Sequence, residues 1–192
     1  MFTKPQAVKK LMKEAYNGAG LRLAATEERY YIAGNYWEMD VKKGFIAKPV
    51  LAAMVELAGE IPAPGERFRA DKTGNHVEEG QMEVAAADQE TEIAVTGLVL
   101  YDVLGNPQRI LQDECKGRIV LVDNRFIEMT DNSCIEYSKG EHEVDRPFYA
   151  PGKGCCYSNN VMRLFFCVRM DMEHGQLIRS LESIDLCPGV TA

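Results

Sequence analysis

Residues 29–41 read Arg-Tyr-Tyr-Ile-Ala-Gly-Asn-Tyr-Trp-Glu-Met-Asp-Val, and this stretch has the strongest local pattern in the first half of the chain. Two runs rich in aromatic and apolar residues flank Gly34-Asn35, a dipeptide suited to the tight primed turn of a β-hairpin. The pattern therefore predicts two antiparallel strands, Arg29–Ala33 and Tyr36–Val41, joined by a short turn.

One helix is predicted on each side of this hairpin. Before it, Thr3 and Gln6 form a capping-box pattern and apolar residues repeat at helical spacing, which predicts a helix over about 4–16. After it, Pro49 and Gly59 stand at the start and the end of an apolar segment, which predicts a buried helix over about 48–58. Both helices fall in the N-terminal third.

Beyond residue 90, apolar residues tend to recur at every second position, which is typical of strands. A short strand and a turn are also expected around 67–75, within the Pro- and Gly-rich stretch 61–80. We therefore predict an α+β fold in which hairpins and meanders form an antiparallel sheet. The later strands are expected at 91–103, 109–114, 118–122, 125–129, 162–172 and 176–186.

The chain has 192 residues, of which 46% are apolar, and this size suits one core. We expect a single domain over 1–192, with a possible seam at 60–90. The 22 basic and 29 acidic residues give a net charge of −7, which disfavours contact with a polyphosphate unless the basic residues cluster. Neither a signal sequence nor a long apolar stretch is found, so the expected compartment is the cytoplasm and no membrane partner is expected.

All six cysteines lie in the second half of the chain, and their spacing lacks the paired pattern of a structural zinc site. They are interpreted as reduced thiols, with no metal. Motifs of serine hydrolases, kinases and dinucleotide-binding enzymes are absent, so we expect no catalytic residue, no cofactor and no enzymatic activity. One alternative stays open, a cysteine-dependent enzyme with Cys156 and His142 as its reactive pair.

The segment from Thr73 to Gln108 contains no Lys or Arg but many acidic residues. A surface of carboxylates can imitate a phosphate backbone and occupy the basic groove of another protein, although such residues also form ordinary solvated surfaces. The leading hypothesis is a non-catalytic protein that binds and inhibits a basic, nucleic-acid-handling protein. Its expected partner-binding residues are the acidic Glu78, Glu79, Glu83, Asp88, Glu90 and Glu92 and the aromatic Tyr36 and Trp37.

The hairpin offers a second hypothesis, an accessory module of a phage or conjugative element that binds nucleic acid directly. Aromatic rings rimmed by positive charge can stack on the bases of a single strand. Because alternate residues of a strand point to opposite faces, at most half of the set can face one ligand. The set consists of Tyr30, Tyr31, Tyr36 and Trp37 with Arg29, Lys42 and Lys43.

The chain combines an acidic α+β build, a lack of enzyme motifs and stretches such as Ile46–Leu51 and Pro62–Glu66. In these features it resembles small accessory proteins of phages and mobile elements in gut Firmicutes. That group includes anti-CRISPR proteins directed against Cas9. The resemblance implies a non-catalytic protein that binds a nuclease or its guide complex and blocks DNA recognition or cleavage. It carries no specific motif, so it assigns no site residues.

Overall fold

The computed structural model describes residues 1–79, 91–113, 117–135, 143–144, 146–151, 153–169 and 174–186. The chain divides into two compact units. Unit 1 comprises Met1–Ala86, Met129–Val144 and Ser158–Phe165, and unit 2 comprises Ala87–Glu128, Asp145–Tyr157 and Phe166–Ala192. The α+β class, the antiparallel sheets and the two helices in the N-terminal third are confirmed. A single domain over 1–192 stays a prediction.

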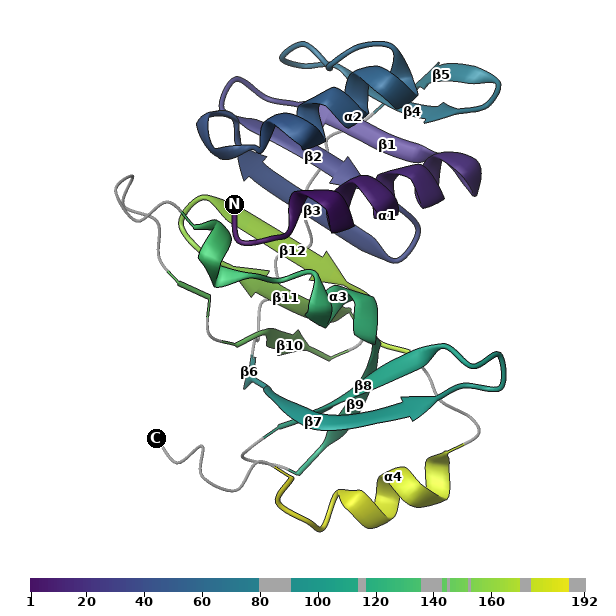
Figure 1. Cartoon of the computed structure of the whole chain (residues 1–192), viewed down its shortest axis with the longest axis vertical. Coiled ribbons are helices and arrows are strands. Elements are labelled where there is room, and N and C mark those ends of the chain that lie inside the picture. Colours follow the sequence, from purple (N-terminus) through teal and green to yellow (C-terminus); the bar gives the residue numbers. More distant parts are fainter. Residues whose placement is uncertain are drawn as a thin grey trace. The chain divides into compact units, whose positions relative to one another are not determined.

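Unit 1 is a sheet with helices α1 and α2 lying over one face (Figure 1). Its strands follow the order β5-β4-β1-β2-β3-β12, and the pairs from β5 to β3 are antiparallel. The 3-10 turns η1 (Lys43–Phe45) and η2 (Asn132–Cys134) also belong to it. The main elements are α1 (Pro5–Asn17), β1 (Leu21–Ala25), β2 (Arg29–Ala33), β3 (Trp37–Lys42), α2 (Lys48–Ala58), β4 (Arg67–Asp71), β5 (Gly74–Val77) and β12 (Met162–Phe166).

The core of unit 1 forms because alternate strand residues and one stripe of each helix are apolar. Both helices begin with a proline in the first turn, and α2 ends where Gly59 adopts a left-handed φ of 79° and donates its N–H to Val55. Burying each large apolar side chain stabilises the fold by about 1.5–3 kcal/mol. The buried set includes Val8, Leu11, Met12, Leu21, Leu23, Ile32, Met39, Met54 and Phe68.

The predicted aromatic hairpin is confirmed as β2 and β3, with Ile32 opposite Met39. Gly34 donates its N–H to the carbonyl of Trp37, and a Cβ on Gly34 would lie 2.4 Å from the indole Nε1 of Trp37. Glycine is needed here because the indole occupies that space. Tyr36 lies in the turn and not, as predicted, in the strand.

Unit 2 contains a three-stranded antiparallel sheet, β7-β8-β9, and the strands β11, β10 and β6, which pair in that order. Buried residues Ile110, Ile119 and Leu121 form an apolar cluster with side chains of helix α4 and of Leu100 and Leu186. The elements are β6 (Thr91–Glu92), β7 (Ala94–Tyr101), β8 (Pro107–Gln112), β9 (Ile119–Asp123), α3 (Asn124–Glu128), β10 (Phe148–Ala150), β11 (Gly154–Ser158) and α4 (Gly175–Leu181).

Two predicted strands are wrong. Residues 125–128 of segment 125–129 lie in helix α3, because the carboxylate of Asp123 accepts the N–H of Arg125 and starts a turn that buries Phe126. Segment 176–186 begins as helix α4, since Ile178 and Leu181 are three residues apart and so reach the apolar cluster from one helical face. Strands β1, β10 and β11 were not predicted.

Candidate functional site

A buried carboxylate, Asp40 on β3, is the most constrained charged group of unit 1. Its side chain is 0% exposed. Arg29 contacts Oδ1 through Nη2 and donates to it from Nε at 2.8 Å, and Arg163 donates to Oδ2 from Nε at 2.9 Å. Arg29 also donates to the carbonyl of Val161 at 3.2 Å. A single carboxylate thus joins β2, β3 and β12 and leaves one of the two guanidinium charges uncompensated.

Strand alternation places the Asp40 side chain on the sheet face opposite the apolar core residues Leu23, Ile32 and Met39. The same face carries Tyr31, which lies opposite Asp40 on β3 and opposite Ala24 on β1. We call it the cationic face. Its basic residues are Arg22, Arg29, Lys42, Arg67 and Arg69, and Arg163 reaches it through Asp40.

The charges of the cationic face do not cancel. Arg67 pairs with Glu78 at 3.2 Å, whereas Arg69 lies 3.8 Å from Asp71 and its buried Nε has no acceptor. Among the described residues of this face, six cations stand against four carboxylates, Glu38, Asp40, Asp71 and Glu78, which leaves two positive charges in excess in a chain of net charge −7. The basic residues of unit 1 therefore cluster on one face. An acidic protein needs such a cluster in order to bind a polyphosphate.

The Asp71 carboxylate interacts mainly with residues of its own turn. Hydrogen bonds from the hydroxyl and the N–H of Thr73, followed by the contact with His76, lower the pKa of Asp71 to about 2. The long Arg69–Asp71 pair and the 42% exposure of the Arg69 side chain leave its guanidinium reachable from solvent.

Of the six acidic residues expected to bind a partner, three lie within the described residues. Glu78 is paired with Arg67 on the cationic face, while Glu79 is exposed at the end of the β4–β5 hairpin. Glu92 is exposed on β6 of unit 2. Glu83, Asp88 and Glu90 lie outside the described residues.

The aromatic residues of the hairpin separate as the alternation rule requires. Tyr36 is 66% exposed in the turn, but Trp37 is 5% exposed and packs against Gly34. The ring of Tyr30 lies 5.0 Å from the Lys43 amine, on the face opposite Tyr31. Among the four aromatic residues, only Tyr31 combines a place on the cationic face with partial exposure.

The strand pattern contains a signal that could have identified the basic residues of the site. In Leu21-Arg22-Leu23 and in Arg67-Phe68-Arg69, arginine alternates with buried apolar residues, so each arginine must point away from the core. Residue spacing alone does not reveal that β4, β1, β2 and β12 lie in one sheet, and sequence reasoning missed Arg22, Arg67, Arg69 and Arg163 for this reason.

The cysteines of the described residues, Cys134, Cys155, Cys156 and Cys167, are reduced thiols. Burial, followed by the neighbouring Cys156, raises the pKa of Cys155 to about 12, which makes its thiolate scarce at neutral pH. Cys156 is also buried, and His142, its suggested partner, lies outside the described residues. In the same part of the chain, no three His, Cys, Asp or Glu side chains gather to hold a metal ion.

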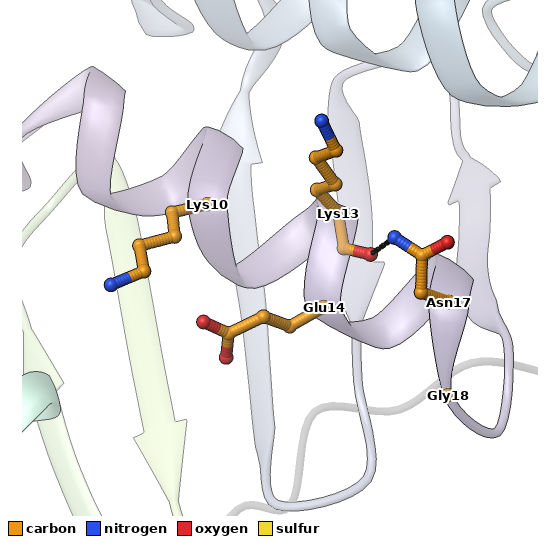
Figure 2. Close-up of a pocket in the computed structure, with 5 residues that line it drawn as sticks. All are labelled: Lys10, Lys13, Glu14, Asn17 and Gly18. Carbon is orange, nitrogen blue, oxygen red and sulfur yellow. Dashed lines mark hydrogen bonds between the residues drawn. The ribbon is translucent and has the colours of Figure 1, made fainter.

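Figure 2 shows a depression at the C-terminal half of α1, lined by Lys10, Lys13, Glu14, Asn17 and Gly18. The Lys10 and Lys13 side chains extend in different directions, and Asn17 donates to the Lys13 carbonyl at 2.9 Å. Since no polar groups converge there, the depression lacks the features of a ligand site.

Comparisons of this chain with protein families, with curated proteins and with solved structures gave no match. Within the described residues, no helix is both long enough and apolar enough to span a bilayer.

Proposed function

We propose that the chain is a binding protein that holds a single-stranded nucleic acid on the cationic face of unit 1. One observation carries the proposal: six basic side chains lie on the same sheet face as Tyr31 in a chain of net charge −7. Proteins that bind single strands combine a positively charged surface for phosphates with aromatic rings on which bases stack.

Tyr31 is well placed for stacking because its cross-strand neighbour Ala24 is small and Ala33, two residues along β2, is small as well. Arg22 lies opposite Ala33, and its Nη2 donates to the Gly34 carbonyl at 2.9 Å, which fixes the guanidinium on the cationic face. Arg163 and Arg69 supply further guanidinium groups that are 37% and 42% exposed. Guanidinium forks can donate two parallel hydrogen bonds to a phosphate.

The test is fluorescence anisotropy of labelled oligo-deoxythymidine titrated with the full chain over a salt series. Stacking on an aromatic side chain contributes about 1–3 kcal/mol per base, so Tyr31→Ala should weaken binding by about 5- to 150-fold. Arg22→Gln should reduce the slope of log affinity against log salt by about 0.7 if it contacts one phosphate. Tyr36→Ala, in the turn of the same hairpin, is the matched control and should leave affinity within about twofold.

Absence of oligonucleotide binding at low salt would contradict the proposal. Equal losses for Tyr31→Ala and Tyr36→Ala would contradict it too, because they would place the contact at the hairpin turn and not on the sheet face.

A second candidate function, inhibition of a basic nuclease such as Cas9, is supported by the net charge of −7 and by the exposed Glu79 and Glu92. This function predicts that immobilised guide-loaded Cas9 retains the chain at low salt and releases it at high salt. Glu79→Lys and Glu92→Lys should each weaken retention, and Lys72→Gln in the exposed β4–β5 turn is the control. Failure to retain the chain at low salt would count against an inhibitor of this nuclease.

A further inference from the structure

Strand β7 is an edge of the sheet β7-β8-β9. Tyr101 lies opposite Pro107, which has no N–H, and the next residue, Asp102, donates its N–H to the Asn106 carbonyl at 3.1 Å. Hydrogen-bonded and non-bonded pairs alternate along an antiparallel ladder. The backbone groups of Leu100 and Asp102 therefore face β8, and those of Val99 and Tyr101 point to the open edge.

This edge lacks most of the features that prevent edge strands from pairing. No charged residue and no proline occurs from Ile93 to Tyr101. A β-bulge lies between Val95 and Val99, and there the Thr96 hydroxyl accepts the N–H of Leu98 at 3.1 Å. This contact protects only the first part of the edge from pairing. Val99–Tyr101 is left with outward N–H and C=O groups that no described residue satisfies.

Large apolar side chains surround the open edge. Leu98 is 44% exposed, Tyr101 63%, Val103 79% and Leu104 82%. Together they expose roughly 400 Å² of apolar surface, which is the size of the largest patch on a typical monomer. Such patches commonly mark binding surfaces.

The β7–β8 loop is already ordered and its charge is neutralised. The Asp102 carboxylate accepts the N–H groups of Leu104 at 3.0 Å and Asn106 at 2.8 Å, and Arg169 donates to it at 3.1 Å. The Asn106 side chain and backbone, followed by Leu104 and Arg169, lower the pKa of Asp102. A partner therefore meets a preformed, uncharged surface and does not have to order it.

We propose that β7 pairs with the β7 strand of a second copy of this chain, antiparallel and around a twofold axis at Leu100. Val99 then exchanges backbone hydrogen bonds with the partner subunit's Tyr101, and the reciprocal pair forms by symmetry. A second copy fits because its β7 strand presents the same outward N–H and C=O groups at Val99 and Tyr101. The uncharged segment also lets two chains of net charge −7 meet without placing like charges in contact.

The exposed apolar area lies below the roughly 800 Å² per partner of a standard stable interface, so we expect a weak dimer with a Kd in the micromolar range. Added salt should strengthen the dimer, because it screens the repulsion between two acidic chains. Binding of nucleic acid to unit 1 should respond to salt in the opposite direction, so the two proposals can fail independently.

Sedimentation velocity of the full chain from about 5 to about 300 µM tests the dimer, a range that brackets a weak interface. Leu98→Lys puts a charge beside the pairing edge and should raise the Kd at least tenfold. Val77→Lys, an equal charge change at a residue that is 88% exposed in unit 1, should not change it. A wild-type chain that stays monomeric over this range, or equal effects of the two variants, overturns the proposal.

Cross-linking gives a second measurement that does not depend on dimer strength. Residues of a non-hydrogen-bonded pair have Cα atoms about 4.5 Å apart, which a disulfide can span. Leu100→Cys should therefore form a disulfide-linked dimer under mild oxidation, well above the background of wild type and of Val77→Cys. A band no stronger than in those controls overturns the pairing.

Discussion

The cationic face of unit 1 and the β7 edge of unit 2 are both exposed parts of antiparallel sheets, yet they have opposite chemistry. The cationic face combines arginines with carboxylates around the buried Asp40. The β7 edge has unpaired backbone groups and apolar side chains, and its nearest carboxylate, Asp102, is neutralised by Arg169. The net charge of the whole chain predicts the character of neither surface, because the fold gathers basic residues on one and apolar residues on the other.

The two regions also differ in what holds them together. Unit 1 joins three strands through one carboxylate shared by two arginines, whereas the unit 2 sheet packs on the apolar cluster around Ile110. Charge removal should therefore damage the first region far more than the second, and variants of each region can test this difference.

Asp40→Asn should lower the free energy of unfolding of unit 1 by about 3–5 kcal/mol, because it leaves two guanidinium groups without their buried counter-charge. Urea unfolding followed by the fluorescence of Trp37 measures this, since the chain has one tryptophan and it is buried in unit 1. Glu38→Gln, the partly exposed neighbour, is the control and should change the free energy by less than about 0.5 kcal/mol. Similar small losses for both variants would remove the contrast.

Ile110→Val should lower the stability of the unit 2 sheet by about 0.5–1.5 kcal/mol, through the loss of one buried methylene and the small cavity that remains. Amide hydrogen exchange of β8 and β9 reports this loss locally. Ile184→Val, at a residue that is 50% exposed, should leave exchange unchanged. A loss above about 3 kcal/mol would exceed what one buried methylene contributes and would contradict this assignment.

Leu104→Ser should change the stability of the β7–β8 hairpin by less than about 0.5 kcal/mol, because a side chain that is 82% exposed contributes little to the fold. Exchange of the β7 and β8 amides measures the effect in monomeric protein at low concentration. A loss of more than about 1 kcal/mol would mean that the loop residues serve folding, which would weaken the case for a binding surface.

Thr73→Val should raise the pKa of Asp71 from about 2 toward its ordinary value of 3.8, because the hydroxyl of Thr73 is the main group that lowers it. The folded-state pKa lies below the ordinary one, so the stabilisation by the carboxylate is complete above pH 3.8 and is lost as the pH falls toward 2. The carbon chemical shift of the Asp71 carboxyl, followed against pH, gives the value. Lys72→Gln is the control, and an equal shift in both variants would contradict the assigned cause.

Local patterns predicted the elements that carry their own signals. The helix Lys48–Ala58 has its proline and glycine boundaries within the segment, and the hairpin β2–β3 has its turn residues in the centre. Segments 125–129 and 176–186 were predicted as strands because each follows a turn signal, although Leu177, Ile178, Leu181 and Ile184 repeat at helical spacing. The burial of Phe126 and the packing of Ile178 and Leu181 against the apolar cluster favour helices in these segments.

The candidate site was predicted less well than the fold. Strand alternation correctly implied that the hairpin aromatic residues would separate onto two faces, but it did not identify Tyr31 as the one on the cationic face. The acidic partner-binding residues stay a prediction, since the described residues place only Glu78, Glu79 and Glu92. Spacing in sequence carries no information about which distant strands pair.

Interactions between residues close together in the chain are enough to specify the α+β class, the two N-terminal helices and the aromatic hairpin. Long-range strand pairing, in contrast, places arginines from β1, β2, β4 and β12 on the same sheet face as Tyr31 and leaves β7 as an edge. Strand order is fixed by burial and hydrogen bonding between segments as far apart as Asp40 and Arg163, and local propensity does not encode that choice.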